Sequence, residues 1–212
     1  PQRRRLAACW LAWRGASAWA GSDATESRKL HERETGDVNS EPIKLVFAGP
    51  MGAGKTTAIR SIADSPPIST EMELSEGASA EKSTTTVAFD FAVVNLDDDT
   101  PLHVYGMPGQ EYFSFMRRIL LQGAIGVVLV LDGSVASIAS DCSTWLASLR
   151  ENDAPMHVVI GITKTDQAPQ FSLAAVRNAI RQTRQPIPVF TFDARDTEQT
   201  THLVRALLVS MT

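Results

Sequence analysis

Six apolar segments along the chain have the pattern of β-strands. The first, residues 43–49 (IKLVFAG), is rich in β-branched residues and ends in glycine, as a short buried strand does. The next two, residues 89–96 and 102–106, flank an acidic turn that ends in Thr-Pro, so together they predict a hairpin. The last three are almost continuously apolar, which is typical of a sheet covered on both faces. These three are residues 124–132, 156–162 and 188–192.

Segments with the apolar spacing of helices lie between these strands. Ser172 and Thr197 begin the last two helical segments and are the expected N-caps. Because strands and helices alternate after one early hairpin, the order predicts an α/β fold. The expected architecture is a six-stranded, mostly parallel sheet with one antiparallel edge strand and helices on both faces. The helical segments are residues 55–64, 140–152, 172–184 and 197–210.

The composition divides the chain near residue 40. Residues 1–40 hold three of the four tryptophans and a triple arginine, and they end in a polar stretch with few apolar residues. We expect a disordered tail there, or a start codon placed too early; a basic, Trp-rich helix on a membrane surface is the alternative. An export signal is disfavoured because Arg14 interrupts its short apolar run. Residues 41–212 are expected to form one domain.

Charge and cysteine content exclude several classes of protein. A net charge of −4 gives no reason to expect nucleic-acid binding. Cys9 and Cys142 are far apart in the sequence, so no disulfide framework is expected and the cytoplasm is the expected compartment. No segment has the apolar length of a membrane span, and the four histidines are too scattered to predict a zinc site.

The clearest chemical motif is GPMGAGKTT, residues 49–57, which follows a predicted strand and opens a predicted helix. It fits the phosphate-binding pattern G-x-x-x-x-G-K-[ST], in which backbone N–H groups and the helix N-terminus surround phosphate oxygens. We expect Lys55 to bridge the β- and γ-phosphates and the Thr56 hydroxyl to bind Mg²⁺. The nucleotide-binding residues expected in this loop are Gly49, Gly52, Ala53, Gly54, Lys55, Thr56 and Thr57.

A threonine cluster precedes the second strand, in the sequence EKSTTTVAFDF. Small GTPases place a threonine here that contacts Mg²⁺ and the γ-phosphate. Thr86 fits this place best, with Thr85 as the alternative, so Thr56 and Thr86 are the expected metal ligands. The stretch before them, residues 64–83, is rich in Ser, Pro and Glu and is expected to be a mobile switch loop.

The third motif is the turn that follows residues 102–106, in the sequence LHVYGMPGQEYF. The amide of Gly109 could donate to the γ-phosphate, and Gln110 could orient the attacking water as the matching glutamine does in Ras-type proteins. The expected catalytic residues are therefore Gln110 and Lys55. Gly106 stands where these proteins have an aspartate that holds Mg²⁺ through water, so weaker binding of Mg²⁺ is expected.

The fourth motif, TKTD, ends at Asp166 and follows the fifth strand. GTPases use N-K-x-D at this place, where the aspartate accepts hydrogen bonds from guanine N1 and N2 that adenine cannot provide. Lys164 is expected to pack along the base, while Thr163 replaces the usual asparagine. After the last strand, the sequence DARD places Ala194 where a backbone amide approaches guanine O6.

Taken together, these motifs resemble the bacterial small GTPases related to the gliding-motility protein MglA. Within that group they look closest to the actinobacterial conservon-type, CvnD-like branch, whose switch turn also reads PGQ without the usual aspartate. The resemblance covers residues 43–212 and implies a Ras-like P-loop NTPase fold with GTP or GDP and Mg²⁺ as cofactors. It also implies Roadblock/LC7-type and sensor-kinase-like protein partners, which could recruit a monomer or weak dimer to the inner face of the membrane.

The function predicted from these motifs is a GTP-hydrolysing signalling switch. Met51 occupies the place where Ras-type proteins have a glycine that admits an arginine finger, so we expect slow intrinsic hydrolysis that partners stimulate. Arg117 and Arg118 are expected on a solvated helix face. Two alternatives stay open: a nucleotide-binding adaptor without hydrolysis, and an ATP-specific P-loop enzyme such as a kinase.

Overall fold

The computed structural model describes residues 42–66, 68–74, 85–95, 101–110, 113–152, 157–183 and 186–211. The expectation for residues 1–40 lies outside these ranges. The strands are β1 (Ile43–Ala48), β2 (Ile68–Leu74), β3 (Thr85–Asn95), β4 (Pro101–Gly106), β5 (Ala124–Asp132), β6 (Val158–Thr163) and β7 (Val189–Thr191). The helices are α2 (Lys55–Ile62), α3 (Met116–Leu121), α4 (Ile138–Glu151), the short 3₁₀ helix η4 (Thr165–Gln167), α5 (Leu173–Arg181) and α6 (Thr197–Val209).

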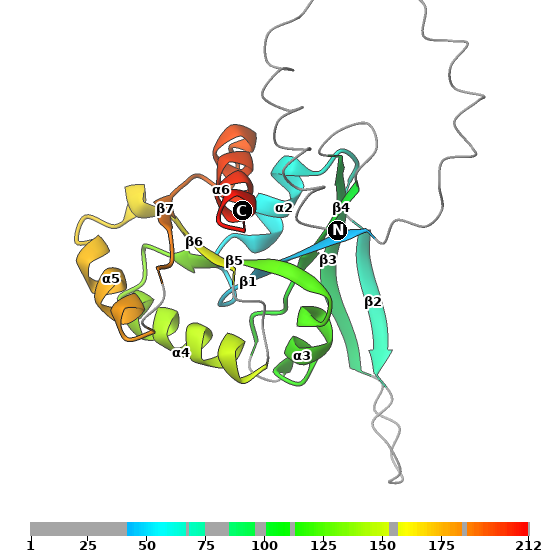
Figure 1. The fold of residues 1–212 in the computed structure, drawn as a ribbon, viewed down its shortest axis with the longest axis horizontal. Coiled ribbons are helices and arrows are strands. Elements are labelled where there is room, and N and C mark those ends of the chain that lie inside the picture. Colours follow the sequence, from blue (N-terminus) through cyan, green and yellow to red (C-terminus); the bar gives the residue numbers. More distant parts are fainter. Residues whose placement is uncertain are drawn as a thin grey trace, which may run out of the picture.

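One sheet runs through the whole domain, in the order β2-β3-β4-β1-β5-β6-β7 (Figure 1). Strands β4, β1, β5, β6 and β7 are parallel to one another, while β3 is antiparallel to both β2 and β4. The six predicted strands are all present, and the hairpin of β3 and β4 is confirmed. The α/β class is therefore confirmed as well.

A seventh strand was not predicted. Residues 68–74, expected to belong to a switch loop, form β2 and pair with β3 from Ile68–Phe91 to Leu74–Thr85. The edge of the sheet is therefore β2, and β3 lies inside it. The segment ISTEMEL alternates apolar or β-branched residues with polar ones, which is the period of a strand. The remainder of the expected switch loop, residues 75–84, lies outside the described part of the chain.

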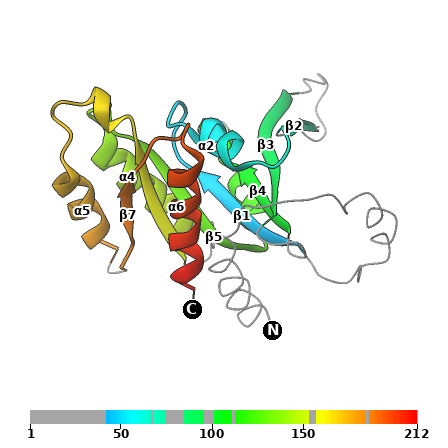
Figure 2. The ribbon, with the colours of Figure 1, turned by 90° about the horizontal axis from the view of Figure 1, so that it is seen from above.

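Helices cover both faces of the sheet (Figures 1 and 2). Helices α2 and α6 pack on one face, whereas α3, α4 and α5 pack on the other. The central strand β1 contributes to both cores, because Leu45 and Phe47 face α2 and α6 while Val46 and Ala48 face the opposite way. This two-sided burial accounts for the continuous apolar composition of the central strands. No helix in the described part of the chain is long and apolar enough to cross a membrane.

Two local predictions were wrong. Arg117 on α3 is buried and not solvated: its guanidinium lies 4.5 Å from the Trp145 ring centre, and its Nη1 donates to the Ser148 hydroxyl at 2.7 Å. Planar stacking of this kind is available to Arg but not to Lys. At α6 the N-cap is Asp196, whose carboxylate accepts from two backbone N–H groups, and Thr197 is the first helical residue. Arg118 is exposed as expected.

Candidate nucleotide site

The loop between β1 and α2 has a backbone that depends on glycine. Gly49 and Gly54 adopt φ values of 139° and 98°, where residues with a Cβ are strained. A Cβ at Gly49 would also lie 2.0 Å from the carbonyl oxygen of Val130 on β5. The loop therefore lies directly over the carboxyl end of the sheet, and its amides at the start of α2 are available to an anion.

Lys55 begins α2 and is buried beneath this loop. Its Nζ donates to the carbonyl oxygens of Gly49 at 2.8 Å and Pro50 at 2.7 Å. Burial lowers the pKa of Lys55 to about 8, while the negative charge of Asp90 acts in the opposite direction. The ammonium group is thus held at the phosphate-binding loop, next to a carboxylate.

Asp90 is a site residue that the sequence motifs did not reveal. It lies on β3 and accepts a hydrogen bond from the Thr56 hydroxyl. The strand register pairs Phe91 with Tyr105, which places Asp90 across from Gly106. A Cβ at Gly106 would lie 3.0 Å from the Asp90 Cβ and 3.2 Å from its Oδ2. The Asp90 side chain therefore occupies the space beside Gly106, where the expected aspartate was missing.

The chemistry of this pair fits a magnesium ion. Mg²⁺ prefers oxygen ligands and keeps several waters, so one hydroxyl and one carboxylate beside a phosphate site are a suitable donor set. The backbone of Thr86 lies on β3 four residues before Asp90, about 13 Å away along an extended strand, and pairs with Glu73 of β2. Side chains at 85–88 are not described, so its role as a ligand stays a prediction.

The turn after β4 lies against the phosphate-binding loop. A Cβ at Gly109 would lie 2.4 Å from the backbone nitrogen of Met51, so only glycine allows this approach. The Gln110 Nε2 donates to the Sδ of Met51 at 3.6 Å, and Met51 is 72% exposed. Gln110 is thus positioned at the entrance of a cavity of about 340 Å³, whose wall includes Lys55, Thr56 and Asp90.

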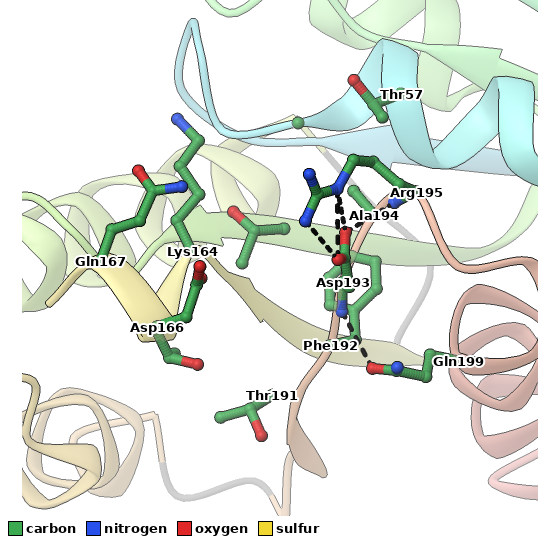
Figure 3. A pocket seen from close by; sticks show the side chains of 13 residues that line it. Thr57, Lys164, Asp166, Gln167, Thr191, Phe192, Asp193, Ala194, Arg195 and Gln199 are labelled. Carbon is green, nitrogen blue, oxygen red and sulfur yellow. Dashed lines mark hydrogen bonds and ion pairs between the residues drawn. The ribbon is translucent and has the colours of Figure 1, made fainter.

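A second cavity, of about 500 Å³, is lined by residues of the TKTD and DARD sequences (Figure 3). Lys164 and Asp166 lie on one side of it and Arg195 on the other, with Ala194 beside Arg195. The two cavities share Gly54 and Thr57, so they adjoin at the start of α2. The structure therefore brings together the motifs predicted to bind phosphate and base.

Lys164 has a partner that sequence reasoning missed. Its Nζ forms an ion pair with Asp132 at the end of β5, at 2.5 Å, and donates to the carbonyl oxygen of Gly52 at 2.8 Å. Although burial opposes it, hydrogen bonds from Lys164 and Ser134 hold the pKa of Asp132 below its usual value. Lys164 is the one described non-glycine residue with positive φ, at 55°. The contacts with Asp132 and Gly52 hold the Lys164 side chain beside the cavity.

Arg195 was also missed as part of the site. Its guanidinium donates three hydrogen bonds to Asp193, from Nε to both carboxylate oxygens and from Nη2 to Oδ2, and hydrogen bonds from Arg195 lower the pKa of Asp193 to about 2 (Figure 3). A bidentate pair fixes the orientation of the guanidinium. The charged residues that flank Ala194 in the DARD sequence were the feature from which Arg195 could have been predicted as part of the site.

Comparison with known proteins decides the family. The model described as Ras of Complex, Roc, domain of DAPkinase matches residues 44–166, more than half of the chain. The chain belongs to the Ras/Roc-type small GTPases. This family and the G-domain fold imply a GTP-binding switch.

Relatives of this small GTPase come from all three domains of life. It is 27% identical to the mutual gliding-motility protein MglA of Myxococcus xanthus, over 68% of this chain and 77% of that protein. It is 29% identical to an uncharacterized protein of Methanocaldococcus jannaschii, over 61% and 74%. A Ras-related protein of Arabidopsis thaliana, RABA1c, is 28% identical over 55% of this chain and 50% of its own.

The fold of this small GTPase is also found among solved structures. The G domain of the T. maritima FeoB iron transporter superposes with a TM-score of 0.56, over 80% of this chain and 98% of that domain. Sequence identity is 18%, so this likeness shows the fold alone.

Proposed function

We propose that the chain is a GTP-binding and GTP-hydrolysing molecular switch of bacterial signalling, with slow intrinsic hydrolysis. The observation that carries this proposal is the junction of the two cavities at Gly54 and Thr57. A single guanine nucleotide extending across that junction would place its phosphates at Lys55 and its base at Asp166.

Selection of guanine rests on Asp166. Its carboxylate offers only acceptors, and guanine presents two donors on one edge, N1–H and the N2 amine. Adenine has an acceptor at N1, so it would leave the carboxylate unpaired, and sites built on such pairs discriminate strongly. The ATP-specific alternative is disfavoured for this reason.

Thr56 and Asp90 are the residues that would hold Mg²⁺, with Thr86 joining them if β3 and the segment before it rearrange. Bound Mg²⁺ would neutralise charge on the β- and γ-phosphates. In the protein itself, Asp90 and Lys55 place opposite charges side by side at this cavity. The site therefore has a carboxylate for the metal and an ammonium for the phosphate.

Gln110 is the residue that would orient the attacking water. To do so it must leave Met51, because its Nε2 is engaged by the Met51 sulfur. Met51 also stands where an activating arginine would enter in Ras-type proteins. Hydrolysis by the isolated protein should accordingly be slow, and a partner would accelerate it by ordering Gln110.

The partners and the cellular setting follow from the resemblance to MglA-related, CvnD-like proteins. We infer Roadblock/LC7-type and sensor-kinase-like partners for a cytoplasmic protein that they recruit to the inner face of the membrane. The 27% identity to MglA supports a bacterial relationship. Pull-down of such partners by the GTP-loaded form and not the GDP-loaded form is the expected result.

Nucleotide preference tests the proposal directly. GTP and GDP should each raise the melting temperature at concentrations where ATP has no effect, because a ligand stabilises only the state that it binds. Asp166→Asn should exchange the preference from guanine to xanthine nucleotides, since xanthine replaces the N2 donor with an oxygen acceptor. Equal stabilisation by ATP and GTP would contradict the proposal.

A nucleotide-binding adaptor without hydrolysis is the second candidate. The contact between Gln110 and Met51 favours it, because it occupies the Gln110 Nε2 that would otherwise be available to orient a water. Single-turnover conversion of bound GTP, compared between the wild type and Gln110→Leu, separates the two. Equal rates in both proteins would support the adaptor.

A further inference from the structure

Thr163 is the last residue of β6 and contacts the phosphate-binding loop. Its side chain is 2% exposed, and its Oγ1 donates to the carbonyl oxygen of Ala53 at 2.8 Å, with the carbonyl oxygen of Leu131 at 3.2 Å. A hydroxyl has one hydrogen, and both neighbours are acceptors only. The single donor of Thr163 is therefore already used inside the protein.

The methyl group of Thr163 is confined as well. A Cβ added at Gly54 would lie 3.4 Å from the Thr163 Cγ2, so the methyl group lies beside Gly54. The hydroxyl of Thr163 thus contacts residue 53 of the loop, and its methyl group lies beside residue 54. Thr163 fastens the phosphate-binding loop to β6, and rotation about χ1 to free the hydroxyl would leave the Ala53 carbonyl buried without this donor.

The chemistry of guanine determines which of its atoms would face Thr163. With N1 and N2 at Asp166, the next atom around the ring is O6, which would face the loop that carries Ala194. N7 follows O6 and would then face the remaining part of the wall, formed by Gly54 and Thr163. N7 is an acceptor and requires a donor, which this wall does not offer from Thr163.

The two neighbouring cationic side chains of the cavity each have a carboxylate partner. The Lys164 ammonium is bound to Asp132 and Gly52, and the Arg195 guanidinium is bound to Asp193. We propose that this site recognises guanine by its N1, N2 and O6 edge and leaves N7 unread, because Thr163 is committed to the phosphate-binding loop. This inference rests on the proposed guanine-nucleotide function and specifies how the base is selected.

The test compares GDP with 7-deaza-GDP, in which a C–H replaces N7. Affinities for the purified protein are measured by competition against a fluorescent GDP, with ADP as a third competitor. We expect the two guanine nucleotides to bind within about threefold of each other, because one neutral hydrogen bond changes affinity by that amount or more. A larger penalty for 7-deaza-GDP overturns the inference.

Two variants at position 163 test whether this side chain determines how the site responds to N7. Thr163→Asn supplies two amide donors, so it should weaken 7-deaza-GDP relative to GDP by more than about threefold. Thr163→Val keeps the shape but loses the donor to Ala53, and it should weaken both nucleotides equally. A 7-deaza penalty in the wild type that Thr163→Val abolishes would show that Thr163 does read N7.

The ADP measurement separates this inference from the function on which it rests. Equal binding of ADP and GDP would contradict the proposed guanine specificity itself. A preference for GDP over ADP together with a 7-deaza penalty contradicts only the inference about N7. If either variant fails to fold, the wild-type ratio alone still decides.

Discussion

Exchanging Asp90 and Gly106 tests whether the carboxylate of Asp90 on β3 takes the role of the aspartate that was expected at position 106 on β4. Asp90→Asn removes the charge but keeps an acceptor for the Thr56 hydroxyl. Loss of a hydrogen-bonding partner in the outer coordination shell of a metal typically costs about 10- to 100-fold in affinity for that metal. We therefore expect about a 10- to 100-fold higher Mg²⁺ requirement for GDP retention, with little change in melting temperature.

The contacts around Gly106 set the size of the effect in the other variants. A Cβ there would lie 2.9 Å from Ile59 Cδ1 and 3.0 Å from Asp90 Cβ. Gly106→Asp alone should thus destabilise the domain by about 1–3 kcal/mol through overpacking, and it places two carboxylates together. The double variant Asp90→Gly/Gly106→Asp removes the clash with Asp90 and leaves only the methyl group of Ile59, which can rotate away.

The assay is the release rate of fluorescent GDP as a function of free Mg²⁺. Asp90→Asn and Asp90→Gly should shift the midpoint to higher Mg²⁺, and the double variant should recover part of that shift. The coupling between the two positions should amount to about 1–3 kcal/mol in stability. Glu151→Gln, at an exposed carboxylate on α4, is the matched control and should leave the midpoint unchanged.

Two outcomes would refute this reasoning. Midpoints for Asp90→Asn and the wild type within twofold of each other would show that Asp90 does not act on the metal. A double variant no better than the sum of its single changes would show that residues 90 and 106 do not share one space.

Three further predictions concern the phosphate cavity. Gln110→Leu should lower single-turnover hydrolysis of GTP at least about tenfold while GDP affinity stays constant, because the glutamine acts on the water; an equal loss of affinity would contradict this role. Met51→Leu keeps the bulk but removes the sulfur that holds Gln110, so hydrolysis should rise by about two- to fivefold, and a rate at or below that of the wild type would count against it. Since burial lowers the pKa of Lys55 to about 8, GDP affinity should be constant below about pH 7 and fall by up to about tenfold per pH unit above pH 8, as the neutral amine replaces the charged form. Titration from pH 6.5 to 9.5 measures this, and a flat profile would be inconsistent with the low pKa.

Much of the fold could be predicted because local patterns and burial agree. β1 and β5 are apolar apart from Lys44 and the terminal Asp132 and are covered on both faces, so their composition alone identifies them. β2 was missed because its Ser and Glu content resembled a loop, although the alternation in ISTEMEL has the period of a strand. An edge strand carries a weaker signal than a central one, since fewer of its side chains must be apolar.

The site could be predicted where one continuous segment supplies the chemistry. The phosphate-binding loop is such a segment, because Gly49, Gly54 and Lys55 act within a few residues of one another. Contacts between segments were not predictable in this way. The pairing of Lys164 with Asp132 depends on adjacent strand ends, and the burial of Arg117 depends on the packing of α3 against α4. Neither contact can be recognised from the residues that adjoin it in the sequence.

Asp90 shows how a motif can be incomplete in the sequence and complete in space. Read along the chain, Gly106 is a missing carboxylate. Read across the β3–β4 ladder, residues 90 and 106 are neighbours whose Cβ positions would be 3.0 Å apart. The site can hold one side chain there and not two, so an aspartate at 90 requires a glycine at 106. A signal was present in FDFAVV, where an acid stands on the face of β3 that also carries the buried Ala92. An acid on a buried face is costly unless it has a partner or a function, and Thr56 supplies the partner.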